Sequence, residues 1–259
     1  MKTIVSLIFM FIATITFAEN KFDHSHKYFD QVLKKYLNKN FLVKYQVLKK
    51  DSSDPNHIFP KYLKSLSAVS KQTFNSWNKN QKMAFLINSY NAFTLKLIVD
   101  HYPVKSIKDI GSLFTKPWDI KFFTFLDNKE MSLDPIEHQM LRPVFKDPRI
   151  HAAVNCASIS CPKLARTAFT AQNLELLLET QTKEWINDTT RNKAASSGKW
   201  QLSKIFDWYE EDFVQWGKGV TEFVAKYHDG LNGRVGAKKV DIDYLEYNWR
   251  LNDAKKNPS

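Results

Sequence analysis

Residues 79–100 read KNQKMAFLINSYNAFTLKLIVD, the longest stretch of helical periodicity in the chain. Most of its apolar side chains recur at spacings of three and four residues, as on the buried face of an amphipathic helix. The face expected to enter the core consists of Met83, Ile87, Tyr90, Leu95 and Ile98. Pro103 follows closely, and because the residue before a proline disfavours the helical region, we expect this helix to end near Asp100.

Shorter elements are expected on both sides of this helix. Helical spacing of apolar residues predicts further helices over about 29–37, 58–66, 171–187 and 207–216. Strand patterns are present within 41–47, 121–126, 150–155 and 240–247, with a turn at 127–129. Helices and strands mix without regular alternation and without internal repeats, which is typical of an α+β fold. We therefore predict a single mixed α+β domain in which several helices pack on a small sheet.

The first eighteen residues have the pattern of a secretory signal peptide. Lys2 supplies the charged start, an apolar run extends from Ile4 to Phe17, and Thr16-Phe17-Ala18 forms a small-x-small cleavage box. We expect residues 19–259 to be exported as one globular domain, to the periplasm or to the outside of the cell. No later stretch has the length and apolarity of a membrane span, so we expect no stable membrane insertion after cleavage.

The composition indicates a folded, basic protein. Hydrophobic residues make up 43% of the chain and include 19 Phe and 7 Trp, enough for a large core and unlike a disordered sequence. The formal charge is +11, and removal of the leader deletes only Lys2, which leaves +10. The basic residues are scattered, unlike the block or helical stripe of a nucleic-acid groove, so we expect no nucleic-acid partner. The charge favours anionic envelope surfaces or acidic substrates, or is simply a solvated surface.

Both cysteines lie in one short segment, residues 149–162, which reads RIHAAVNCASISCP. In an exported protein, Cys156 and Cys161 are most simply a disulfide across a tight loop. The alternative is a nucleophilic thiolate at Cys156, placed at the end of the strand predicted over 150–155. Such a thiol needs its pKa lowered by a nearby base, cation or helix N-terminus. Both interpretations remain open at the level of the residues.

A nucleophile at Cys156 requires a base. His151 would lie on the opposite face of an extended strand, roughly 16 Å from Cys156 at about 3.3 Å per residue, so we assign it to substrate contact. We predict His138 as the base, in a short helix opened by Asp134 and Pro135. Four residues later, Arg142 shares its face, and with Asn155 it could hold a carboxylate or a developing oxyanion. Arg149 is a further cationic candidate for substrate binding.

Other polar residues have two interpretations each. Glu137 has the spacing of a capping box with Asp134, which we prefer to a place in a catalytic triad. Asn88 and Asn91 could orient His138 or contact substrate, but polar groups on an apolar helix face are more simply buried hydrogen-bond bridges. Ser158 and Ser160 are loop or cap residues that could also bind a substrate. Aromatic residues could line a glycan or peptide groove or belong to the core; they are Trp118, Trp200, Trp208, Tyr209 and Trp216.

Neither a metal nor a cofactor is predicted. The histidines and cysteines show no CxxC or HExxH spacing, and with only 7 Gly the chain has no glycine-rich phosphate loop. The expected substrate is a small molecule, a peptide or a glycan.

Several separated motifs resemble one known family, the domain of unknown function 547. The motifs are Trp77-Asn78, KMAFLINSYNA at 82–92, IEHQMLR at 136–142, the segment 147–162, and YNWRLN at 247–252. Leu86 and Asn248 depart from the tryptophan and aspartate common in the family. The resemblance implies candidate site residues, but it implies no particular reaction. It also implies that eukaryotic relatives keep the equivalent of Cys156 but replace that of Cys161 with serine, which a purely structural disulfide does not explain.

Two hypotheses from different classes follow. The first is a cysteine-dependent hydrolase or acyltransferase acting on an envelope amide, ester or thioester, with Cys156 as nucleophile and His138 as base. The second is a non-catalytic module, stabilised by a Cys156–Cys161 disulfide, that binds an anionic ligand.

Overall fold

The computed structural model describes residues 21–194, 199–217, 219–231, 233 and 240–255. The predicted signal peptide, residues 1–18, lies outside this part of the chain. In the described part, no helix is both long and apolar enough to cross a membrane.

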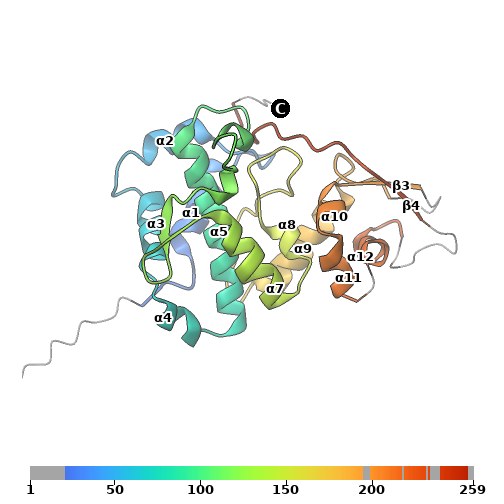
Figure 1. The fold of residues 1–259 in the computed structure, drawn as a ribbon, viewed down its shortest axis with the longest axis horizontal. Helices are drawn as coiled ribbons and strands as arrows, with labels where there is room; N and C mark the ends of the chain where they lie inside the picture. Colours follow the sequence, from blue (N-terminus) through green and yellow to red (C-terminus); the bar gives the residue numbers. More distant parts are fainter. Residues whose placement is uncertain (1–20, 195–198, 218, 232, 234–239, 256–259) are drawn as a thin grey trace, which may run out of the picture.

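The N-terminal half is a group of helices around one long central helix (Figure 1). The central helix is α5, Lys79–His101, which confirms the prediction made from residues 79–100. It begins at a capping box. The Gln81 backbone N–H donates to the Asn78 side chain, and the Asn78 backbone N–H donates to the Gln81 side chain. The four helices beside it are α1 (Lys27–Tyr36), α2 (Tyr45–Asp51), α3 (Ile58–Ser67) and α4 (Lys71–Ser76).

Short elements follow α5. The 3₁₀ turns η1 (Ile107–Asp109) and η2 (Pro117–Asp119) lead into a hairpin of β1 (Phe123–Phe125) and β2 (Lys129–Met131), which confirms the strand and turn predicted there. A continuous helical segment comes next, and its middle part is a π-helix. Its pieces are α6 (Leu133–Pro135), η3 (Ile136–Leu141) and α7 (Arg142–Phe145), and the separate helix α8 (Ile150–Ala153) follows.

The C-terminal part adds four helices and a second pair of strands. The helices are α9 (Leu174–Asn187), α10 (Ile205–Trp208), α11 (Glu210–Gln215) and α12 (Val220–Tyr227). Strands β3 (Lys199–Leu202) and β4 (Asp241–Tyr244) pair in parallel. The α+β class is therefore correct, and the strands of the described residues form two separate two-stranded sheets.

Two strand predictions are wrong. Within 41–47, Val43 makes only isolated bridges, and Tyr45 opens α2 because it and Leu48 turn into the core. Within 150–155, residues 150–153 are helix α8. Every residue of this segment is buried, so the positions of its apolar residues do not distinguish the period of a helix from that of a strand. A short apolar run of this kind cannot be assigned by pattern alone. Alanines at 152 and 153 favour the helix.

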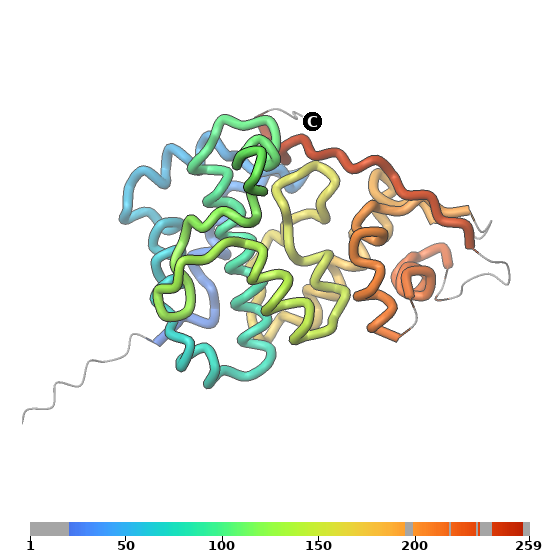
Figure 2. Tube along the Cα trace, viewed as in Figure 1, coloured from blue at the N-terminus to red at the C-terminus, as the bar shows by residue number. Residues whose placement is uncertain are grey.

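Two hydrophobic clusters meet along α8. The larger surrounds α5 and includes Ile150, and the smaller is formed by α9 to α12 with β3 and includes Ala152. After β4, residues 245–255 run back across the molecule from the second cluster to the first (Figure 2). We call this segment the C-terminal strap. It hydrogen-bonds to Leu202 at one end and to Val43 at the other.

Candidate functional site

A cavity of about 580 Å³ lies where the two hydrophobic clusters meet. Its apolar wall is mainly aromatic and is formed by Tyr90, Trp118, Trp208, Tyr209, Tyr247 and Trp249. Its polar wall brings together residues that are far apart in the sequence, among them Glu137, His138, His151, Cys156 and Cys161. The size and the mixture of aromatic walls with a few polar groups are typical of a small-molecule site.

Cys156 and Cys161 form a disulfide on the cavity wall. Cys156 is half-buried, whereas Cys161 is only 3% exposed. Hydrogen-bond donors gather at Cys161 Sγ: the Cys156 backbone N–H at 3.0 Å and the Tyr247 hydroxyl at 3.1 Å. The Ser158 hydroxyl lies 3.3 Å from Cys156 Sγ and 3.5 Å from Cys161 Sγ. The Tyr247 hydroxyl is also 3.3 Å from Cys156 Sγ, so both hydroxyls reach both sulfurs, and Cys161 Sγ has the backbone N–H in addition.

Two asparagines hold the cysteine loop in place. Asn91 on α5 donates to the carbonyl of Ala153 and accepts from the backbone N–H of Asn155. The Asn155 side chain donates to the Pro162 carbonyl and accepts from the Ala157 N–H. Because all of these groups are buried, the bonds fix the backbone on both sides of Cys156. Both asparagines thus position the loop and do not contact the cavity.

The buried His151 is paired with the partly exposed Asp212. His151 Nε2 lies 2.6 Å from Asp212 Oδ2. Burial raises the pKa of Asp212, but hydrogen bonds from His151 and Arg142 outweigh it and lower the pKa to about 2. An ionised carboxylate only accepts hydrogen bonds, so His151 Nε2 carries a proton, and the neutral ring has its lone pair on Nδ1. A carboxylate that orients a histidine in this way is the usual partner of a general base.

His138 has a different environment. Arg142, four residues later, donates from Nη1 to His138 Nδ1 at 2.6 Å, so the predicted shared face is present. A guanidinium only donates, so Nδ1 is the acceptor and the proton of the neutral ring is on Nε2, 3.5 Å from Asp134 Oδ1. The lone pair that a base would use is therefore already held by Arg142. His138 lines the cavity, but it is less suited to accept a proton than His151.

Glu137 is not a capping residue, so that prediction is wrong. Helix α6 begins after Ser132, and Glu137 is buried on the cavity wall. Its carboxylate faces the hydroxyls of Tyr90 and Tyr209. Burial, followed by the charge of Glu137, raises the pKa of both phenols, which therefore stay protonated. Glu137 thus places a negative charge among tyrosine hydroxyls inside the cavity.

The two arginines that we predicted to bind substrate are occupied by carboxylates. Arg142 binds Asp212 through Nε at 2.6 Å and Glu211 through Nη2 at 2.7 Å, and its guanidinium lies over the Tyr209 ring. It lies behind the cavity wall and supports Asp212 and His138.

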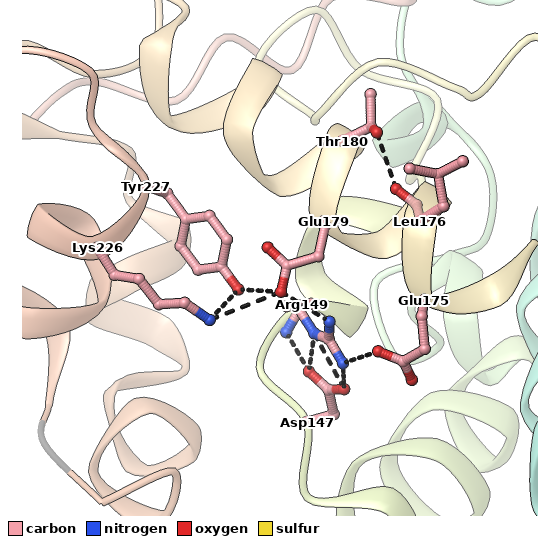
Figure 3. Close-up of polar contacts among 8 residues, drawn as sticks. All are labelled: Asp147, Arg149, Glu175, Leu176, Glu179, Thr180, Lys226 and Tyr227. Atoms are coloured by element: carbon pink, nitrogen blue, oxygen red, sulfur yellow. Dashed lines mark hydrogen bonds and ion pairs between the residues drawn. The ribbon is translucent and has the colours of Figure 1, made fainter. Parts of the chain in front are cut away.

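Arg149 lies away from the cavity, in a network of charged residues (Figure 3). It contacts Asp147 at 2.6 Å, Glu175 at 3.0 Å and Glu179 at 3.1 Å. Burial lowers its pKa, but these carboxylates outweigh it and raise the pKa further above its usual value. Glu179 also lies near Lys226 and Tyr227, so the network joins α9 to α12. Its role in the structure is to hold these elements together.

The remaining predicted residues lie in two places. Ser158 is buried beside the disulfide and forms an isolated bridge with Leu251 of the strap. Ser160 Oγ accepts from the Asn248 N–H, so this serine attaches the cysteine loop to the strap. Asn88 on α5 binds the backbone N–H and carbonyl of Phe169, a bridge that lies away from the cavity.

Residues 74–186, which carry the disulfide and both histidines, match the family described as Protein of unknown function, DUF547. This segment of the chain belongs to the DUF547 family. The match ends before Tyr209, Tyr247 and Trp249, so part of the cavity wall lies beyond it, as does Asp212. No curated protein and no solved structure matches the chain.

Sequence reasoning missed three features of the site. Asp212 follows His151 by 61 residues and had been assigned only to an amphipathic helix, since nothing in the local pattern points to a partner. Tyr247 and Trp249 belong to the motif YNWRLN at 247–252, which is part of the family resemblance, and this motif is the sequence feature that could have pointed to them. Among the residues that the structure describes, no group of three His, Cys, Asp or Glu side chains is placed to bind a metal ion.

Proposed function

We propose that the protein is a cysteine-dependent hydrolase or acyltransferase whose reduced form acts on an amide, ester or thioester. The observation that carries this proposal is that Cys156 and His151 line one aromatic cavity and that His151 is paired with Asp212. A thiol nucleophile, a histidine and a carboxylate that orients it are the recurring parts of cysteine hydrolases. The proposed base is His151, in place of His138.

The reaction begins with reduction of the disulfide by an external thiol, which frees Cys156. His151 Nδ1 then takes the Cys156 proton, and the thiolate attacks the carbonyl carbon of the substrate. The bond to the leaving group breaks as His151 returns the proton to it, which leaves an acyl group on Cys156. Water or an acceptor hydroxyl, deprotonated by His151, releases the acyl group. Aromatic side chains at the cavity mouth give the substrate an apolar surface to pack on.

The test is selective labelling of the reduced protein. In the presence of a dithiol reductant, we expect iodoacetamide to alkylate Cys156 rapidly and a reactive thioester to leave an acyl group on it, detected by mass spectrometry. His151→Gln should slow both reactions at least tenfold, because the thiol loses its base. His138→Gln is the matched control on the same cavity wall, and it should have a much smaller effect. Equal rates in wild type and His151→Gln would contradict the proposal.

A second candidate function rests on the disulfide itself. With Cys156 and Cys161 bonded, neither cysteine of the cavity wall has a free thiol, and the cavity can serve as a ligand-binding site. In that case a ligand binds equally well to the oxidised protein and to Cys156→Ser/Cys161→Ser, and reduced protein forms no acyl adduct. The anionic ligand that we predicted from the two arginines has less support, since both are paired with carboxylates.

A further inference from the structure

A tight turn between η1 and η2 presents two large apolar side chains to solvent. The Ser112 N–H donates to the Thr115 carbonyl at 3.1 Å, and the Thr115 N–H donates back to the Ser112 carbonyl. Leu113 and Phe114 are the two corner residues. They are 98% and 97% exposed, more than any other large apolar residue among those described.

The position of these side chains is unusual. Corner positions of turns favour glycine, proline, asparagine, aspartate and serine, and bulky apolar groups in water forgo the free energy that burial would provide. The turn is also well anchored, because Ile110 and Pro117 on either side of it are buried. At Gly111 (φ +112°) an added Cβ would lie 2.3 Å from the Thr115 carbonyl oxygen. The backbone hydrogen bonds thus hold a tight turn in which the side chains of Leu113 and Phe114 point into solvent.

The sequence around this turn is basic. Exposed lysines stand on both sides, at 105, 108, 116 and 121. Asp109 and Asp119 are the acidic residues of the same stretch. The Asp109 carboxylate accepts backbone N–H groups of Lys105 and Ser106, which caps η1. A pair of apolar side chains among lysines matches the boundary between acyl chains and anionic headgroups of a bilayer.

The shape of the turn favours a lipid surface over a protein partner. A stable protein interface buries about 800 Å² on each side and surrounds its central residues with a rim that excludes water. Here two side chains project from a convex tip, and their neighbours Gly111, Ser112, Thr115 and Lys116 are all exposed. A lipid interface needs no matching rim, since acyl chains adapt to the side chains that enter them.

We propose that the turn Ser112–Thr115 docks the protein on an anionic lipid bilayer, with Leu113 and Phe114 inserted at the acyl boundary and the flanking lysines among the headgroups. The same loop supplies Ile110, Ser112, Thr115 and Lys116 to the cavity wall. Docking therefore places the cavity beside the membrane surface. The inference is independent of the chemistry at Cys156.

The experiment measures sedimentation of the chain from Glu19 onward, which contains every described residue, with vesicles of phosphatidylglycerol and phosphatidylcholine. Binding should increase with the anionic fraction and decrease with salt. Leu113→Ser/Phe114→Ser should weaken binding at least tenfold, and Lys116→Gln/Lys121→Gln should weaken it chiefly at low salt. The matched controls are Leu176→Ser, an exposed apolar residue on α9, and Lys193→Gln/Lys199→Gln, and they should leave binding unchanged.

Failure of wild type to bind, or equal binding by the double serine variant, would overturn the proposal. So would self-association that the double serine variant abolishes, because the tip would then be a contact between copies of the chain. Circular dichroism and thermal unfolding should be the same for wild type and the double serine variant, since neither side chain packs against the protein.

Discussion

At the scale of single residues, the two histidines of the cavity differ in what their nitrogen atoms contact. Asp212 binds Nε2 of His151, the nitrogen that carries the proton, whereas Arg142 binds Nδ1 of His138, the nitrogen that carries the lone pair. Sequence spacing could not distinguish the two histidines. The partner of His151 is 61 residues away in the chain, and the expected distance between His151 and Cys156 assumed a strand where the structure has helix α8.

Tyr247 provides a prediction at this scale. Reduction by a thiol that attacks the half-buried Cys156 leaves Cys161 as a thiolate, and a donor to that sulfur speeds departure of the leaving group. The Tyr247 hydroxyl is 3.1 Å from Cys161 Sγ. Tyr247→Phe should slow reduction by dithiothreitol at least about tenfold, because a hydrogen bond to a charged group is worth about 1.5–3 kcal/mol and a factor of ten corresponds to about 1.4 kcal/mol. The rate is measured by quenching with a thiol reagent and counting free thiols.

Tyr244→Phe is the control for this measurement, since Tyr244 lies in β4 near Lys204 and not at the disulfide. A Tyr247→Phe rate equal to that of wild type would mean that the hydroxyl does not stabilise the leaving sulfur.

At the scale of elements, α5 positions the cysteine loop through a single buried side chain. Asn91 satisfies both the Ala153 carbonyl and the Asn155 N–H, which are otherwise enclosed in the core. The sequence indicated that a polar group on this face needed a partner, and it did not indicate which segment the partner came from. The π-helical geometry of η3, which carries Glu137 and His138, also has no signature in the pattern of apolar residues.

Asn91→Leu tests this connection. The variant leaves two buried backbone groups without partners, and each costs about 1–3 kcal/mol, so we expect the free energy of unfolding to fall by about 2–6 kcal/mol. The measurement is urea unfolding of the oxidised protein. Asn40→Ala, at an exposed position outside the core, should change the unfolding free energy by less than about 0.5 kcal/mol. A loss of the same small size for Asn91→Leu would show that the loop is held mainly by other contacts.

At the scale of the whole molecule, the C-terminal strap joins the two hydrophobic clusters and completes the cavity. Along the strap, its backbone is hydrogen-bonded in order to Leu202, Ile159, Lys105, Ala157 and Val43. Buried side chains reinforce it: Tyr45 donates to Asn252, and Tyr102 donates to Asp253. Tyr247 and Trp249 of the strap belong to the cavity wall.

Removal of the strap should therefore destabilise the whole molecule. With several hydrogen bonds lost at about 0.5–1.5 kcal/mol each, deletion of residues 245–259 should cost at least about 4 kcal/mol, or roughly 8–16 °C in Tm. Calorimetry measures this change. Deletion of residues 256–259 alone keeps the strap contacts named above and should lower Tm much less. If both deletions gave the wild-type Tm, the strap would not couple the two clusters.

The sequence by itself determined the elements whose patterns are long or distinct enough to be unambiguous, namely α5, the helices α1 and α3, and the β1–β2 turn. It also identified the family of the segment 74–186. It also located the segment that holds both cysteines. Only the tertiary structure decided what that segment contacts. Short buried runs such as residues 150–155 have no exposed face to reveal their period, so α8 could not be distinguished from a strand. The pairing of His151 with Asp212, the burial of Glu137 among tyrosines and the closure of the cavity by the strap join segments far apart in the chain. Such contacts depend on how elements pack against one another, which local patterns of residues do not encode.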